Sequence, residues 1–224
     1  KVSNSPTDGY VLTAQSGNTG GLTWAAQSSG GGLTSDSDKN TIGGTNAGDS
    51  ITSGSGIQNT LIGYDAGTAI TTGYENSIYG YNAGKTITTG FYNVLIGSQA
   101  GDSLSVNANN NVAIGTFALS SAASGENVAI GSNALESTDG TRNVAVGKQA
   151  LQNSSGVNFL VAVGYQALNS LTTGSDCTAV GYYAGKSLTT GSKNTLIGYE
   201  AGKALTTGGE NSLVGWEAGK SITT

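Results

Sequence analysis

The chain has 224 residues, 37 of them glycine, and its 9 basic and 14 acidic residues give a net charge of −5. The acidic balance argues against a nucleic-acid partner, because phosphate binding needs clustered Lys and Arg. The absence of His excludes Ser–His and Cys–His nucleophile pairs, and the scattered carboxylates give glycoside hydrolysis no support. The sequence contains no apolar run of about 18 residues, the length that predicts a membrane-spanning helix, so we expect no membrane insertion.

Three regions are predicted along the chain. Residues 1–26 are expected to form a small β-hairpin module with strands at 10–15 and 22–26. Residues 27–39 have the composition of a Gly/Ser linker. Residues 40–224 form a repeat domain whose last repeat is incomplete, so we expect the sequence to be a segment of a longer protein.

The repeat domain contains eleven units with spacings of 16 to 19 residues. The fifth position of every unit is Gly and the eighth is Ala, as in Gly63, Ala66, Gly80, Ala83, Gly198 and Ala201. A residue that eleven copies share is fixed by the geometry and packing of every coil rather than by a single catalytic site. The units start at Asn40, Asn59, Asn76, Asn93, Asn111, Asn127, Asn143, Leu160, Cys177, Asn194 and Asn211.

Each unit predicts one coil of a parallel β-solenoid. Positions 2 to 4 are rich in β-branched residues and predict a short strand, and the Gly that follows predicts a tight bend. Positions 11 to 13 predict a second strand, closed by a Gly turn in most units. Parallel pairing of successive coils about 4.8 Å apart gives an all-β rod of roughly 50 Å.

The oligomeric state is predicted from positions 3 and 4, which point to opposite faces of one strand. Both positions are apolar, as in the pair Leu61 and Ile62. One face fills the interior of the coil, and the other needs a second cover because an exposed aliphatic stripe favours aggregation. The sequence therefore predicts symmetry-related copies around a central axis, with a homotrimer as the natural arrangement for a fibre.

Two stretches resemble known families. NVAIGTFAL, NVAIGSNAL, NVAVGKQAL and VAVGYQAL, between residues 111 and 168, resemble the head repeats of trimeric autotransporter adhesins, the YadA-like heads. This resemblance implies a left-handed parallel β-roll in a trimer, with a longer second turn here because that family's repeat is shorter. Residues 6–24 look like short modules in bacteriophage tail fibres, which implies a trimeric fibre attached to a virion.

Aromatic residues recur at position 6 and form a predicted ladder along the stack. Two interpretations stay open for this column. Sugars stack on aromatic faces, so the ladder is a candidate glycan-contact strip; alternatively it is a structural ladder that covers a turn or the trimer interface, which we favour. The candidate residues are Tyr165, Tyr182, Tyr199 and Trp216.

Three polar columns are interpreted as structural. Lysines at position 10, near Glu200 and Glu217, are expected on a solvated face of offsetting charges rather than in an anion site. Paired Thr at positions 13 and 14 predict a Thr ladder rather than an ice-binding face. Asn at position 1 predicts an inward amide ladder, interrupted by Leu160 and Cys177. Cys177 is the only cysteine, so no intrachain disulfide is expected.

These observations predict a non-enzymatic structural and adhesive segment of a trimeric phage tail fibre, located in the virion and contributing to host attachment. Expected partners are two further copies, other tail proteins and a host receptor or glycan, with no metal and no cofactor. Two alternatives stay open. The first is the head of a bacterial trimeric adhesin at the cell surface, and the second is a carbohydrate-binding module that uses the aromatic ladder.

Overall fold

The computed structural model describes residues 10–14, 22–26, 33–121 and 125–224, in two units that divide after Gly32. In the first unit, strand β1 (Tyr10–Ala14) pairs antiparallel with β2 (Leu22–Ala26). This pairing confirms the predicted hairpin strands, while the turn between them lies outside the described residues.

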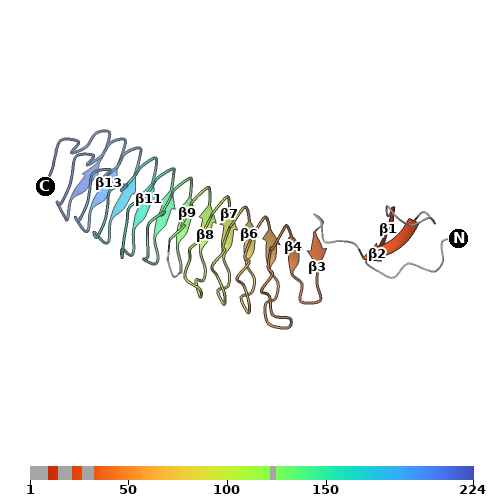
Figure 1. Ribbon diagram of the computed structural model, residues 1–224. Helices are drawn as coiled ribbons and strands as arrows, with labels where there is room; N and C mark the ends of the chain where they lie inside the picture. The colour runs from red at the N-terminus through yellow and green to blue at the C-terminus, as the bar shows by residue number, and fades with distance from the viewer. Residues whose placement is uncertain (1–9, 15–21, 27–32, 122–124) are drawn as a thin grey trace. The chain divides into compact units, whose positions relative to one another are not determined.

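The second unit is a β-solenoid built on one sheet of twelve strands that follow one another in chain order (Figure 1). The first strand pairs antiparallel with the second, and the remaining eleven pair in parallel, one from each repeat. Within the described ranges the chain forms no helix, so the predicted all-β solenoid is confirmed. The strands are β3 (Thr34–Ser35), β4 (Thr41–Gly43), β5 (Thr60–Ile62), β6 (Ser77–Tyr79), β7 (Val94–Ile96), β8 (Val112–Ile114), β9 (Val128–Ile130), β10 (Val144–Val146), β11 (Val161–Val163), β12 (Thr178–Val180), β13 (Thr195–Ile197) and β14 (Ser212–Val214).

The end of the predicted linker belongs to the solenoid. Residues 27–32 of that segment lie outside the described residues, but β3 pairs with β4 and covers its open edge. Asp36 continues this cap, since its two carboxylate oxygens accept from the backbone N–H and the Nδ2 of Asn40 at 2.8 and 2.9 Å. The first coil thus has an antiparallel strand where other coils have a parallel neighbour, which protects the sheet edge.

The prediction of a second strand in each coil is wrong. Positions 11 to 13 form turns, and successive coils meet there through isolated backbone bonds, such as Thr71 N–H to Thr88 O at 2.9 Å. The chain reaches this side through tight turns in which positions 7 and 9 both have positive φ, as at Asp65 (53°) and Gly67 (56°). The chain bends again at the Gly turn near position 15. The extended part between the two turns is therefore too short to form a β-ladder with the neighbouring coils.

Position 3 of each strand points into the interior, where it is joined by apolar residues at position 12 such as Ile70, while positions 2 and 4 point outward. Leu61, at position 3, is fully buried, and Thr60 and Ile62 on either side are half-buried. Ala at position 8 is buried in every coil but the last, as expected from its constancy. The core is therefore one continuous column of apolar side chains parallel to the axis, and each coil adds one layer.

Two packing solutions fill this column. Where position 3 is Leu or Ile, position 9 is Gly, as in Leu95 and Gly101. A Cβ on Gly101 would lie 2.8 Å from Leu104 Cδ1 and 3.0 Å from Leu95 Cδ2, so the large side chains occupy its space. In four central coils the pattern reverses, as in Ala113 with Leu119, both fully buried. In these coils core volume is thus conserved by exchange between positions 3 and 9. The coil from Cys177 differs, since it has Ala179 and Gly185, and Leu168 and Leu196 of the neighbouring coils fill the space at Gly185.

The Gly column at position 5 has a direct structural cause. All eleven of these glycines have φ between 120° and 142°, a region that L side chains rarely adopt. A Cβ at any of the first ten would also overlap the backbone of the equivalent Gly in the next coil. Both effects follow from the bend after each strand, which confirms the predicted close backbone approach.

Candidate functional site

The outward side of the sheet carries an apolar stripe in its middle part. In five consecutive strands, β7 to β11, positions 2 and 4 are both Val or Ile, and these side chains are half-buried or exposed. On the flanking strands position 2 is Thr or Ser. We call this stripe the outer apolar face. It consists of Val94, Ile96, Val112, Ile114, Val128, Ile130, Val144, Val146, Val161 and Val163.

The predicted aromatic ladder is present as a continuous stack over four coils. Ring centroids lie 5.4 Å apart for Tyr165 and Tyr182, 5.2 Å for Tyr182 and Tyr199, and 4.2 Å for Tyr199 and Trp216. The planes of these pairs differ by 16° or less, so each inner ring has both faces covered by its neighbours. Because sugars stack on ring faces, this geometry favours the structural interpretation over a glycan strip.

One phenol in the stack has an altered acidity. The hydrogen bond with the neighbouring Tyr183, followed by partial burial, raises the pKa of Tyr182 to about 12. Its hydroxyl therefore stays protonated over the physiological range. Tyr183 also lies under a cation, since Lys186 Nζ is 4.1 Å from its ring centroid.

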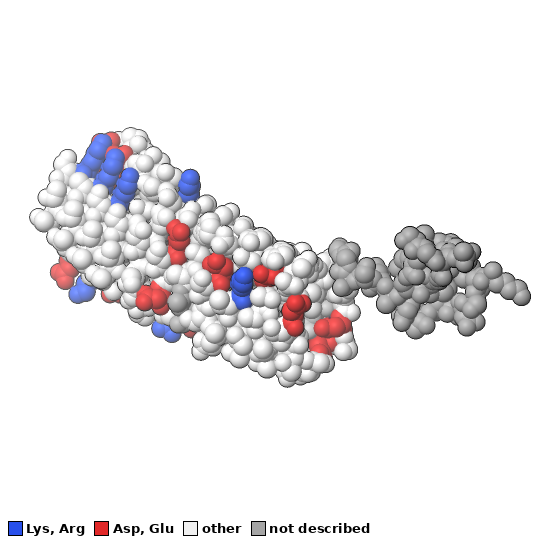
Figure 2. Space-filling view, in the orientation of Figure 1, with Lys and Arg blue, Asp and Glu red and all other residues white. Residues whose placement is uncertain are grey.

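At the C-terminal end of the solenoid, the lysines of position 10 form ion pairs with carboxylates. Glu200 is buried, and its two oxygens pair with Lys203 at 2.8 Å and Lys220 at 3.1 Å, while Lys220 also contacts Glu217 at 2.9 Å. These cations, Lys203 first, hold the pKa of Glu200 below its usual value. Figure 2 shows basic and acidic side chains together at the C-terminal end of the solenoid, and further acidic side chains along the rest of this face. The arrangement favours offsetting charges over an open anion site.

The Thr column joins coils through its hydroxyls. Thr172 Oγ1 donates to Thr189 O at 3.0 Å, and Thr189 Oγ1 donates in turn to Thr206 O at 3.0 Å. The first Thr of four of the five pairs bonds between coils in this way, while Thr88 Oγ1 donates to Thr86 O of its own coil, so the column largely matches the predicted structural ladder.

The Asn column is a buried amide ladder, as predicted. Asn59 Oδ1 accepts from both the backbone N–H and the Nδ2 of Asn76 at 3.0 Å, and Asn76 Nδ2 also donates to Gly90 O at 2.9 Å. The ladder is interrupted where Leu160 and Cys177 replace Asn, and it resumes between Asn194 and Asn211. Cys177 is buried, and burial raises the pKa of its thiol, which keeps it protonated and unreactive.

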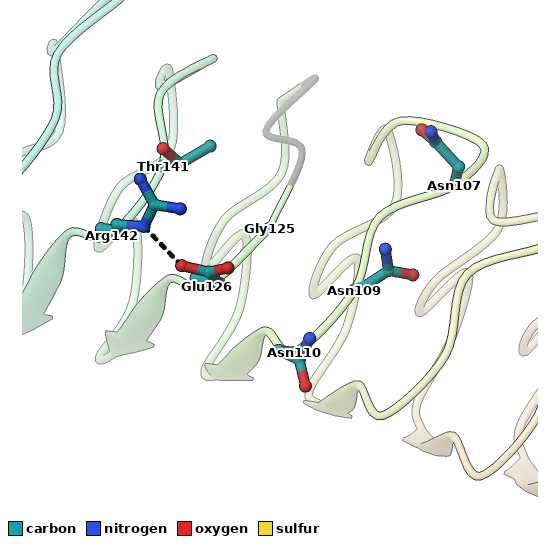
Figure 3. A pocket seen from close by; sticks show the side chains of 7 residues that line it. All are labelled: Asn107, Asn109, Asn110, Gly125, Glu126, Thr141 and Arg142. Atoms are coloured by element: carbon teal, nitrogen blue, oxygen red, sulfur yellow. Dashed lines mark hydrogen bonds and ion pairs between the residues drawn. The ribbon is translucent and has the colours of Figure 1, made fainter.

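Sequence reasoning did not identify a polar groove on the edge of the solenoid just before the strands (Figure 3). Its volume is about 220 Å³. The groove lies where the repeat spacing falls from 18 to 16 residues and where Gly125 has no side chain to fill it. That irregular spacing was the signal available in the sequence. The groove is lined by Asn107, Asn109, Asn110, Gly125, Glu126, Thr141 and Arg142.

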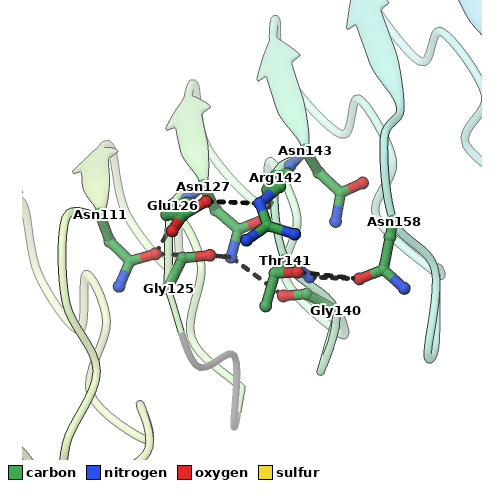
Figure 4. Close-up of polar contacts among 9 residues, drawn as sticks. All are labelled: Asn111, Gly125, Glu126, Asn127, Gly140, Thr141, Arg142, Asn143 and Asn158. Carbon is green, nitrogen blue, oxygen red and sulfur yellow. Dashed lines mark hydrogen bonds and ion pairs between the residues drawn. The ribbon is translucent and has the colours of Figure 1, made fainter.

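Hydrogen bonds fix several of these lining residues. Arg142 Nε donates to Glu126 Oε2 of the neighbouring coil at 2.6 Å. Thr141 donates from its backbone N–H and its hydroxyl to Asn158 Oδ1 at 2.8 and 3.1 Å, beside the Asn ladder (Figure 4). Gly125 is closely approached by Asn109, whose carbonyl oxygen would lie 2.7 Å from a Cβ there. These contacts join the lining residues of neighbouring coils at the floor of the groove.

Comparison with known proteins gives no match to a family model, a curated protein or a solved structure. Across the described ranges, no three His, Cys, Asp or Glu side chains come together as a metal site. In the same part of the chain, no helix has the length and hydropathy of a membrane span.

Proposed function

We propose that this chain is a structural and adhesive segment of a trimeric fibre, and that the fibre is a phage tail fibre that contributes to host attachment. The outer apolar face carries the proposal. The eleven parallel strands, about 4.8 Å apart, form a face roughly 50 Å long, and its five central strands, β7 to β11, are entirely aliphatic on their outward side. A contiguous apolar surface of this kind marks an interaction site in a soluble protein.

The partner that suits this face is another copy of the chain. The face follows the solenoid axis and carries the same side-chain types in successive rungs of β7 to β11, so identical copies related by an axis parallel to the solenoid bring like rungs together. Such an axis also keeps the N-termini at one end, which a fibre requires. The threefold order comes from the resemblance of the Asn-Val-Ala-Ile-Gly repeats to trimeric adhesin heads.

The virion setting rests on the resemblance of residues 6–24 to phage fibre modules. A bacterial trimeric adhesin would use the same solenoid and the same outer apolar face. The complete open reading frame separates the two settings, because an adhesin needs an export signal and a membrane anchor. The proposal assigns the chain no catalytic role and no cofactor.

A pair of variants in one coil tests the proposed assembly. Ile130 is 36% exposed on the outer apolar face, and Ser137 is exposed elsewhere on the same coil without a side-chain hydrogen bond among the described residues. Light scattering should show that I130K lowers the mass to that of one chain, whereas S137K keeps the wild-type oligomer. Equal masses for both variants would remove the outer apolar face as the interface.

A further inference from the structure

We propose that the groove at Asn110, Glu126 and Arg142 binds a neutral oligosaccharide. This inference rests on the proposed attachment role, for which it names a ligand class and a site. The aromatic stack is a poor candidate for the same task, since its inner rings cover one another. The groove instead offers polar groups on three consecutive coils (Figure 3).

The groove lies on a column of residues that the fold leaves variable. The residue just before position 1, the corner residue, has a φ between 53° and 63° in all eleven coils, yet it is never Gly. This backbone region is costly for side-chain-bearing residues, by about 1 kcal/mol or more each. The fold therefore fixes the direction of the corner residue and not its chemistry. The corner residues are Lys39, Gln58, Glu75, Tyr92, Asn110, Glu126, Arg142, Phe159, Asp176, Lys193 and Glu210.

The lining of the groove has hydrogen-bonding capacity for a ligand. Arg142 uses Nε for Glu126, and within the described residues its two terminal nitrogens make no hydrogen bond. The side chains of Asn107 and Asn110 likewise have no hydrogen-bond partner in the described part of the chain. Asn109 accepts from the backbone N–H of Phe91 at 3.2 Å, which leaves its Nδ2 as a donor. Adjacent donors and acceptors of this kind match the hydroxyls of a sugar.

The charge of the lining favours a neutral ligand. Among the described residues that line the groove, only Arg142 and Glu126 are ionised, and they form an ion pair at 2.6 Å with both side chains about half exposed. Their charges cancel, so an acidic ligand gains little net attraction. A phosphate or a sulfated chain would need unpaired cations, which this groove lacks.

Aromatic corner residues stand on both sides of the groove. Tyr92 is 46% exposed one coil before Asn110, and Phe159 is 55% exposed one coil after Arg142. Phe159 also supports Arg142, whose guanidinium carbon lies 5.7 Å from its ring centroid. Rings that flank a polar centre provide apolar contact for the C–H faces of sugars. With rungs about 4.8 Å apart, the five corner residues from Tyr92 to Phe159 span roughly 19 Å, room for several sugar units.

The size of the groove predicts weak binding at each site. Ligand pockets usually have volumes of about 300–1,000 Å³, and this groove has about 220 Å³. A single chain should therefore bind weakly. In the proposed trimer three grooves would act together, and multivalency raises the overall affinity without new contacts.

The experiment uses the full chain on a printed array of neutral and acidic oligosaccharides, followed by titration with the neutral oligosaccharide that binds best. Arg142 is the only arginine in the sequence, so its Nε–H gives a single, readily assigned NMR signal. We expect this signal to shift on titration. The R142Q variant should bind roughly tenfold more weakly, the loss expected for a hydrogen bond from a charged group.

A matched control uses the same column elsewhere in the stack. Lys193 and Glu210 are corner residues of successive coils and form an exposed pair at 3.4 Å, as Arg142 and Glu126 do in the groove. K193Q should bind like the wild type. N110G provides a second test if R142Q is poorly behaved, since Asn110 is exposed and Gly suits its φ of 56°.

Three results would overturn the proposal. The first is no binding on the array; a trimeric mass would then still support the fibre while the groove is rejected. The second is binding to acidic oligosaccharides alone. The third is binding that leaves the Arg142 signal unmoved and is lost in Y182A or W216A, which would place the site on the aromatic stack.

Discussion

The exchange of core volume between positions 3 and 9 makes a quantitative prediction. In the coil that begins at Asn111, Ala113 and Leu119 are both fully buried. L119G opens a cavity that should cost about 4 kcal/mol, partly offset by about 1 kcal/mol because a residue with φ of 51° prefers Gly. A113L adds volume to a filled layer and should cost about 2 kcal/mol. Independent effects would sum to about 5 kcal/mol.

The double variant A113L/L119G restores the arrangement of the preceding coil, where Leu95 packs over Gly101. We therefore expect it to cost only about 3 kcal/mol, a coupling of about 2 kcal/mol. Guanidinium unfolding at one fixed chain concentration measures all three free energies. The control pair L119G with A179L, four coils away, should be additive. An additive result for A113L/L119G would refute the exchange argument.

Three further predictions concern the other columns. G147A should destabilise the chain by at least about 3 kcal/mol, since Gly147 has φ of 133° and its Cβ would overlap Gly164; thermal unfolding measures this. C177N should stabilise by about 1–2 kcal/mol, because an amide oxygen there is a stronger acceptor than the Cys177 Sγ to which Asn194 Nδ2 now donates at 3.9 Å. E200Q should lower Tm at neutral pH, with the difference from wild type vanishing in acid, because the folded chain holds the pKa of Glu200 below its ordinary 4.5.

Each of these has a contradicting result. A stable G147A would mean that the bend at position 5 tolerates a side chain. A C177N variant that is less stable than the wild type would show that Asn at position 177 does not join the buried Asn ladder. For Glu200, a lowered pKa means that its contribution is present above the unfolded value and lost as pH falls through the folded value. A Tm difference that grows in acid would therefore contradict the ion-pair account.

The parts of the fold that repeat in every coil could be predicted from the sequence. Gly63 and Ala66 stand for columns that never vary, because every bend and every narrow core layer has the same geometry. The burial of the Asn ladder could be inferred because the apolar residues Leu160 and Cys177 replace Asn in the same column. Eleven internal copies supplied the comparison that a single globular domain lacks.

Features that depend on backbone conformation or on pairs of positions were missed. A second strand was predicted from β-branched residues at positions 11 to 13, but propensity does not show that neighbouring turns bend the segment away from a ladder. Positive φ at corner residues such as Tyr92 and Arg142 has no side-chain signature. The polar groove was missed because it arises from a change in coil length around Gly125, a local departure from the repeat.

The central claim is that the solenoid assembles around its outer apolar face. The most direct test is the light-scattering mass of the full chain in solution, measured over a range of concentrations. The account predicts about 67 kDa, three times the chain mass of 22.2 kDa. A stable species of 22.2 kDa at every concentration would contradict it, because the aliphatic side chains of strands β7 to β11 would then remain open to water.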